Sequence, residues 1–332
     1  MLTAAPSKRL PPVVTIVAAG GLLLVAMGVA VALGSVRLGP GQVFDGLFDR
    51  GDPVARQIVW QLRVPRVLVA ALVGANLGLA GVLLQGITRN PLADPHILGF
   101  SAGAGLAAIA VLVIAPGTPV QLVAPAAFLG SLASAAVVYA LAWRGGISPV
   151  RFALSGVAVA ALFTALSTAV IATSDLFTQA TLSFLAGGLF GRDWSHFKQL
   201  WPYTVGAGSL TLLAAGWLNI LALGDDMARG LGLRVERARL LLAVLAAVLT
   251  GSAVAVSGLL AFIGLVVPHA ARLVAGNDYR VVMPLAAILG AALLVVADTF
   301  ARVALAPTEL PVGIVTAVVG APAFLLLVRT RT

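Results

Sequence analysis

The chain contains apolar runs that are too long and too uniform for a water-soluble fold. The stretch from Val13 to Gly34 has no charged residue and is hydrophobic on every face of a helix. About 20 such residues are what a helix needs to cross a bilayer. Because 60% of the 332 residues are hydrophobic and only 10% are charged, the sequence predicts a polytopic membrane protein.

The membrane spans are predicted to be helices. A barrel strand would alternate apolar and polar residues over about ten positions, and these runs do not. We therefore expect an all-α fold with about ten transmembrane helices in a single transmembrane domain covering residues 1–332. The expected spans are Val13–Gly34, Val64–Leu84, His96–Ala115, Val120–Ala142, Phe152–Thr173, Leu200–Leu223, Leu240–Val256, Leu259–Val274, Val281–Ala301 and Val312–Val328.

The basic residues indicate how the chain is oriented. With ten spans both termini lie on one side, and the segments on that side hold most of the 21 lysines and arginines. The positive-inside rule then predicts a cytoplasmic N-terminus at residues 1–12 and a cytoplasmic C-terminus. A cleaved signal peptide ending at Ala30-Val31-Ala32 is the alternative for the first span, but the length of that run favours a retained helix.

Composition excludes several classes of function. A net charge of +9 would suggest nucleic acid in a soluble protein, but in a membrane protein it follows from the positive-inside rule and from anionic lipid. We therefore expect membrane lipid and no nucleic acid as a partner. The chain has no cysteine, which excludes disulfides and thiol chemistry and leaves the compartment open.

The motifs of soluble enzymes are missing or better explained by packing. The only lysines are Lys8 and Lys198, and neither belongs to a P-loop, so the chain is not expected to hydrolyse ATP by that route. Gly99 to Gly103 fits the Gly-x-Ser-x-Gly nucleophile elbow, but it opens an apolar helix instead of following a strand. We interpret it, like Gly74 and Gly78, as a small-residue face for helix packing.

The three histidines do not predict a metal site. His96, His196 and His269 fall in separate segments, with no pair at helical spacing and no HExxH motif. We expect no metal, no cofactor and no enzyme activity of the chain itself.

Two polar loops stand out between the spans. The segment from Gln85 to Pro95 contains two prolines and predicts a turn. The segment from Leu223 to Arg237 carries acidic residues that suit a helix N-terminus and glycines that suit a helix end, and so predicts two short surface helices forming a docking site. The alternative is a solvated connector that only orders the spans.

These loops carry a resemblance to a known family. The residues concerned are Arg63-Val64-Pro65-Arg66, Gln85, Asn90 to Pro95, Leu98-Gly99, Phe262 to His269, Arg272, Ala297-Asp298, Arg302 and Glu309 to Gly313. In order and spacing they resemble the FecCD family of binding-protein-dependent ABC importer permeases, which includes cobalamin, haem and ferric siderophore permeases. The resemblance extends from about Arg63 to Phe324.

The resemblance implies the partners and the cargo. It implies a multi-pass permease in the plasma (inner) membrane of a prokaryote, paired with a second permease subunit, two ABC ATPase subunits and one substrate-binding protein. The favoured cargo is a ferric siderophore, with haem and cobalamin as alternatives. An ion-coupled secondary transporter is the alternative from another class, but it would need intramembrane acids, and Asp298 is the only acid within a span.

The resemblance also implies three sets of site residues. The arginine cluster, expected to dock the binding protein, is Arg63, Arg66 and Arg302. The coupling loop, residues 222–239, is expected to contact the ATPase through Gly224, Asp225, Asp226, Met227, Ala228, Arg229, Gly230, Leu231 and Gly232. The gate segments are Asn90-Pro91-Leu92 and Ser148-Pro149.

Two of these assignments have structural alternatives. Arg302 lies one helical turn after Asp298 and could pair with it instead of docking a partner. Asn90 could simply cap a turn ahead of Pro91.

Overall fold

The computed structural model describes residues 11–34, 36, 38–48, 50–115, 119–172, 179–306 and 308–329. Over these residues all regular structure is helical, apart from one isolated antiparallel bridge between Trp143 and Ile147. The all-α prediction is confirmed for this part of the chain. The predicted N-terminal segment 1–12 lies almost wholly outside the described residues.

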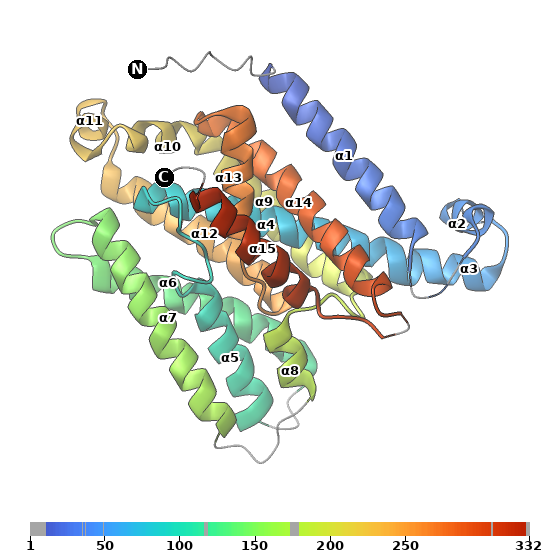
Figure 1. The fold of residues 1–332 in the computed structure, drawn as a ribbon. Helices are drawn as coiled ribbons and strands as arrows, with labels where there is room; N and C mark the ends of the chain where they lie inside the picture. The colour runs from blue at the N-terminus through green and yellow to red at the C-terminus, as the bar shows by residue number, and fades with distance from the viewer. Residues whose placement is uncertain are drawn as a thin grey trace.

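The helices are numbered along the chain (Figure 1). They are α1 (Pro12–Ala32), α2 (Pro40–Leu47), α3 (Pro53–Gln57), a π-helical turn (Ile58–Arg63), α4 (Val64–Thr88), α5 (Phe100–Ile114), a 3-10 turn (Val120–Leu122), α6 (Val123–Ala142), α7 (Pro149–Ala172), α8 (Gln179–Ala186), α9 (Trp194–Leu213), α10 (Ala215–Ala222), α11 (Asp225–Gly230), α12 (Val235–Ser257), α13 (Ile263–Ala275), α14 (Tyr279–Val303) and α15 (Val312–Arg329).

The helix α4 forms the centre of the bundle. An apolar window of the helix that contains it is 78% buried, whereas the windows of α1 and α7 are 11% buried. α4 packs along α14, α12, α13 and α9, and Figure 1 shows α1 and α7 at opposite edges of the molecule. Because α1 and α7 bury so little within one chain, their apolar surfaces are left for lipid or for another subunit.

Glycines let α4 and α14 touch backbone to backbone. A Cβ atom on Gly74 would lie 2.1 Å from the carbonyl oxygen of Gly290, and one on Gly290 would lie 2.3 Å from the carbonyl oxygen of Gly74. One turn further along α4, a Cβ on Gly78 would lie 2.6 Å from the carbonyl oxygen of Ala286. The packing role predicted for Gly74 and Gly78 is confirmed.

The Gly-x-Ser-x-Gly motif is also a packing element. A Cβ on Gly103 would lie 2.5 Å from the carbonyl oxygen of Gly130 in α6. Ser101 is fully buried in the first turn of α5, and the chain before Gly99 is a series of turns rather than a strand. The strand-to-helix geometry of a nucleophile elbow is therefore not formed here.

All ten predicted spans coincide with helices. Six helices are long and apolar enough to cross a membrane, and α9 and α10, which are bent by 44° relative to each other, would give a seventh if they form one span. The other three predicted spans correspond to the shorter apolar helices α5, α13 and α15. The multi-pass character is clear from these helices, and the number of crossings stays a prediction.

α13 is short because irregular backbone precedes it. It was expected to start at Leu259 but begins at Ile263, after Gly258 and Phe262 adopt φ values of +70° and +69°. The irregular segment is paired within the protein, since Leu259 N–H donates to the Phe184 carbonyl at 3.0 Å. Non-helical backbone is tolerated at membrane depth only when the protein satisfies it in this way.

The central helix starts earlier than predicted. The predicted span begins at Val64, whereas the helical chain runs without a break from Pro53 to Thr88, over 36 residues. The Asp52 carboxylate caps its first turn by accepting from the N–H groups of Val54 and Ala55, both at 3.3 Å. The polar residues of that early part hid it from a hydropathy-based prediction.

Candidate functional site

The first gate segment, Asn90-Pro91-Leu92, is the turn that ends α4. Arg89 adopts a left-handed φ of +50° and caps the helix. The Asn90 Oδ1 atom accepts from the Leu92 N–H at 2.9 Å, so the turn-capping alternative for Asn90 is observed. Leu92 is 45% exposed and presents an apolar side chain at this end of the bundle. Its role as a gate stays a prediction.

The coupling loop contains one short helix. Gly224, with φ +109°, precedes α11, which begins at Asp225 and ends at Gly230 as predicted. After Gly232 the chain enters the long helix α12 at Val235, so the prediction of a second short helix in this loop is wrong. Val235 is buried, and this explains why the long helix extends so far toward α11. Figure 1 shows α11 at one end of the molecule, beside α10.

Asp225 is clamped by two arginines. Its Oδ1 accepts from Arg239 Nη2 at 2.7 Å, its Oδ2 accepts from Arg239 Nη1 at 2.9 Å, and Arg89 Nη2 also donates to Oδ1. The Arg239 side chain is 1% exposed, whereas that of Arg89 is 32% exposed. Burial disfavours the charged carboxylate, but the hydrogen bonds and charges of Arg239 and Arg89 outweigh it and hold the pKa of Asp225 below its usual value.

Contacts from α12 reach the second gate segment. Arg239 Nη1 donates to the carbonyl oxygen of Ile147 at 2.5 Å, and the Ile147 N–H donates to Glu236 Oε2 at 3.1 Å. Glu236 Oε1 in turn accepts from Arg229 Nη2, in the last turn of α11, at 3.0 Å. Ile147 directly precedes Ser148-Pro149, where α7 begins, so both backbone groups before this segment are held by α12 side chains.

Sequence reasoning gave no role to Glu236 or Arg239. Their signal was a pair of opposite charges three residues apart, on one face of α12, where that helix enters its apolar run. Such a pair is usually a solvated surface pair, and only the three-dimensional contacts show that the arginine is buried.

The arginine cluster lies at the other end of α4, about 35 Å away by the rise of the helix between Arg66 and Arg89. Arg63 is 4% exposed. Its Nη1 atom donates to the carbonyl oxygens of Val31 and Ala32, both at 2.8 Å. These carbonyls belong to the C-terminal end of α1, which favours a positive charge.

Arg66 and Arg302 share Asp298. Arg66 donates from Nε and Nη2 to the two Asp298 oxygens at 2.8–3.2 Å, and Arg302 Nε lies 3.3 Å from Asp298 Oδ2. Arg66 Nη1 donates to Glu309 Oε2 at 2.8 Å, and Arg302 Nη2 donates to the carbonyl oxygen of Ala30 at 2.9 Å. The internal Arg302–Asp298 alternative to docking is therefore observed.

Burial limits what the arginine cluster can reach. Arg66 is 8% exposed and Arg302 is 3% exposed, and each already has an internal acceptor. Direct docking of another protein would require these guanidinium groups to exchange partners. The docking role of Arg63, Arg66 and Arg302 stays a prediction.

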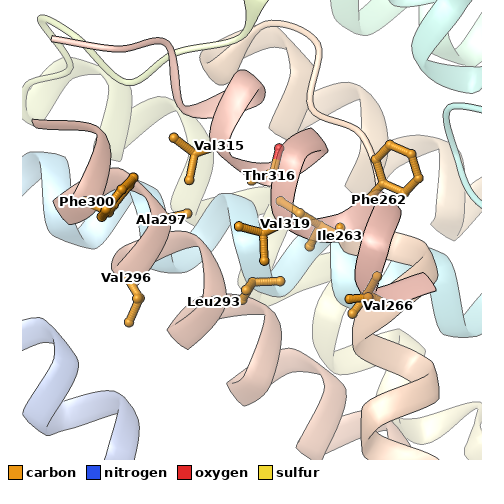
Figure 2. A pocket seen from close by; sticks show the side chains of 12 residues that line it. Phe262, Ile263, Val266, Leu293, Val296, Ala297, Phe300, Val315, Thr316 and Val319 are labelled. Carbon is orange, nitrogen blue, oxygen red and sulfur yellow. The ribbon is translucent and has the colours of Figure 1, made fainter. Parts of the chain in front are cut away.

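An apolar pocket of about 240 Å³ lies between α13, α14 and α15 (Figure 2). Its lining includes Phe262, Leu293 and Phe300, and the hydroxyl of Thr316 donates to the Gly313 carbonyl at 3.0 Å. The lining offers no charged group to an oxygen-rich chelate. Among the residues that the structure describes, no group of three or more His, Asp or Glu side chains could hold a metal ion either.

The chain is similar to known proteins over nearly its whole length. A model of the FecCD transport family matches residues 22–330. The Fe(3+)-citrate import system permease protein YfmE of Bacillus subtilis (strain 168) is 37% identical over 322 residues, covering 97% of this chain and 96% of that protein. The cobalamin import system permease protein BtuC of Halobacterium salinarum is 43% identical over 278 residues, covering 83% of this chain and 74% of that protein.

A solved structure extends the similarity to the fold. A chain described as an inward-facing conformation of a metal-chelate type ABC transporter superposes with a TM-score of 0.86 at 29% sequence identity, covering 95% of this chain and 98% of that one. The family match at residues 22–330 includes the arginine cluster, the coupling loop and the gate segments. This chain belongs to the FecCD transport family.

Proposed function

We propose that this chain is the permease subunit of an ABC importer that moves a ferric chelate, with a ferric siderophore as the favoured cargo, into the cytoplasm. The observation that carries this proposal is the nearly full-length similarity to an iron-citrate permease within the family. Cobalamin is the second candidate, because a cobalamin permease is also among the similar proteins. Haem is the remaining alternative.

ATP hydrolysis is assigned to separate subunits. The chain has no P-loop lysine, and permeases of this family work with ATPase and binding-protein partners. We assign two ATPase subunits to the end of the bundle that carries α11. That helix exposes Met227, at 62%, next to the fully exposed carboxylate of Asp226, and Leu231 just after it is 59% exposed. Apolar residues beside exposed charges suit a protein docking surface.

The binding protein is assigned to the opposite end, near the arginine cluster. Arg66 is the residue best placed to take part, because its Nη1 pairs with Glu309, whose side chain is 15% exposed. A carboxylate of the binding protein could replace Glu309 as the partner of Arg66, while Asp298 keeps the guanidinium oriented. Electrostatic steering would then favour an acidic partner surface.

Transport is proposed to proceed by alternating access. A loaded binding protein docks at one end, ATP closes the ATPases at the other, and the coupling loop moves the gate segments Asn90-Pro91-Leu92 and Ser148-Pro149. The cargo passes without chemical change. The exposed Leu92 side chain supports a constriction that closes by apolar contact between two subunits.

The proposed topology has ten spans, with both termini and α11 in the cytoplasm, in the plasma (inner) membrane of a prokaryote. It is supported by the ten apolar helical regions and by the distribution of basic residues. A second copy or a close homologue would cover the exposed apolar surface of helices such as α7. The whole chain would then be one transmembrane permease domain.

Uptake into liposomes tests the proposal. The chain is reconstituted with its ATPase and binding protein, and ATP-dependent uptake of labelled ferric siderophore, ferric citrate, haem and cobalamin is measured side by side. We expect uptake of a ferric chelate that requires all components. Uptake of cobalamin alone would make cobalamin, and not a ferric chelate, the cargo. Failure to associate with any ATPase would overturn the importer function.

The same vesicles separate this function from ion-coupled transport. Asp298, the acid within a predicted span, is shared by Arg66 and Arg302, which suits a fixed structural pair better than a coupling acid that must change partners in each cycle. Uptake driven by an ion gradient without ATP would support the secondary transporter instead.

A further inference from the structure

The contacts around Asp225 connect the proposed ATPase-docking helix to both gate segments. On one side, Arg89 bonds Asp225 and is the residue directly before Asn90-Pro91-Leu92. On the other side, Arg239 bonds Asp225 and the carbonyl of Ile147, directly before Ser148-Pro149. One carboxylate at the start of α11 is therefore two contacts or fewer from each segment.

The connection through α12 is double. Arg239 joins Asp225 in the first turn of α11 to the Ile147 carbonyl, and Glu236 joins Arg229 in the last turn of α11 to the Ile147 N–H. Both ends of a six-residue helix are thus tied to the two backbone groups of one residue. A single link would permit rotation about it, whereas two links fix both position and direction.

The connection through α4 is also more than one bond. Arg89 donates from Nη2 to Asp225 and from Nε to the carbonyl oxygen of Leu221, at the end of α10, at 2.9 Å. The left-handed turn at Arg89 places Asn90 immediately beyond this attachment. Movement of the α10–α11 corner therefore pulls on the first residue of the gate turn.

The strength of these contacts suits transmission of movement. Charge-assisted bonds are shorter and about twice as strong as neutral ones, and the two-pronged geometry of an arginine on a carboxylate adds direction. Arg239 is 1% exposed, so water cannot readily replace Asp225 as its partner. By contrast, α11 packs only on its neighbours α10 and α12 among the helices with substantial contacts, so little else holds it.

We propose that Asp225, Arg239, Glu236 and Arg89 form a polar relay that transmits movement of α11 to the two gate segments. The relay has an α4 arm, Asp225–Arg89, that leads to Asn90-Pro91-Leu92. Its α12 arm, through Arg239 and Glu236, leads to Ser148-Pro149. These are positioning residues, and the inference rests on the proposed function, because it requires an ATPase to move α11.

The test uses the fact that the natural chain contains no cysteine. Leu92→Cys and, separately, Val150→Cys place one thiol in the first gate segment and one just after the second, at positions that are 45% and 66% exposed. The complex with ATPase and binding protein is placed in lipid nanodiscs. The rate of thiol modification by a water-soluble maleimide is measured without nucleotide and after trapping with ATP and vanadate.

In the otherwise natural chain, both thiols should change their modification rate on trapping. Asp225→Asn keeps the size of the side chain but removes the charge shared by both arms, while the Arg229–Glu236–Ile147 link and the Arg89–Leu221 bond remain, so both changes should become smaller. Uptake should fall by about tenfold or more, because losing one charge-assisted bond corresponds to at least that factor. Asp278→Asn is the matched control, because it changes an exposed carboxylate that caps α14 and lies outside the relay.

Single-arm variants give the sharpest result. Arg89→Gln, at a partly exposed side chain, should remove the response of the thiol at position 92 and keep that at position 150, whereas Glu236→Gln should weaken the response at position 150. Arg280→Gln, at an exposed arginine, is the matched control for the first of these. A merely structural role would not separate the two thiols in this way.

The outcomes distinguish the relay from the function on which it rests. Responses at both thiols that are undiminished in Asp225→Asn and in Arg89→Gln would overturn the relay and leave the importer function intact. No association with an ATPase in the natural chain would overturn the importer function and the relay with it. If Asp225→Asn does not assemble, Arg89→Gln tests the relay alone. Loss of the response at position 92 but not at position 150 would support it, and equal loss at both thiols would count against two separate arms.

Discussion

Gly74→Ala should separate the central helix α4 from α14. The added Cβ would start 2.1 Å from the carbonyl oxygen of Gly290, whereas close C···O contacts between backbones settle near about 3.3 Å. The two helices must therefore move apart by roughly 1.2 Å at this point. The obstacle is backbone, so no side chain can rotate away to make room.

The expected cost follows from two opposing effects. Overpacking of this kind costs about 1–3 kcal/mol, and a strictly backbone obstacle places Gly74→Ala toward the upper end. Alanine regains about 1 kcal/mol of helix propensity over glycine. The net destabilisation should be about 1–2 kcal/mol, or about a 5- to 30-fold change in an equilibrium constant or rate.

Gly20→Ala in α1 is the matched control, because nothing lies within 4 Å of a Cβ built there. It should be neutral or stabilising by up to about 1 kcal/mol. Because unfolding of membrane proteins in detergent is usually irreversible, the assay compares rates of loss of the folded, monodisperse chain at fixed temperatures. A Gly74→Ala chain that survives as long as Gly20→Ala would refute the backbone contact between α4 and α14.

Two further predictions concern charged groups. Glu309→Gln should tighten binding of the substrate-binding protein, because Arg66 then loses an anionic internal partner, whereas Arg66→Met should weaken that binding. Both effects are measured as dissociation constants on the assembled transporter. Equal affinities would remove Arg66 from the docking surface. The ion pairs of Asp225 with Arg239 and Arg89 should persist to low pH, because the pKa of Asp225 is lowered in the folded chain. Their contribution to folding stability is complete above the ordinary aspartate pKa of about 3.9 and is lost as the pH falls through the lower pKa of the folded state. The rate of thermal inactivation should therefore rise below about pH 4, and Asp225→Asn should show a smaller rise because only the contribution of Asp225 is removed.

The sequence predicted the helices well because apolar length is a strong signal. The run from Val13 to Gly34 is too long and too apolar for a water-soluble fold, and the structure has α1 from Pro12 to Ala32. The start of the central helix was missed, although Asp52 followed by Pro53 is a recognisable N-cap and first-turn pair. That local signal lies outside the apolar run, so hydropathy does not detect it.

The candidate site was predictable only where neighbours along one helix were involved. The pairing of Arg302 with Asp298 follows from i,i+4 spacing. The pairing of Arg66 with Asp298 joins residues 232 positions apart, and spacing carries no information about it. Arg239 was likewise hidden, because its burial depends on how α12 packs against the Ile147 segment.

α4 has a consequence for the thermodynamics of the assembled transporter. The same deeply buried helix carries Arg66 near its beginning and is capped by Arg89, so the two ionic clusters are attached to a single rod. If tilting this rod changes the fit at both ends, linkage requires the effect to be mutual. If a docked binding protein raises the affinity for nucleotide by some factor, bound nucleotide must raise the affinity for the binding protein by the same factor.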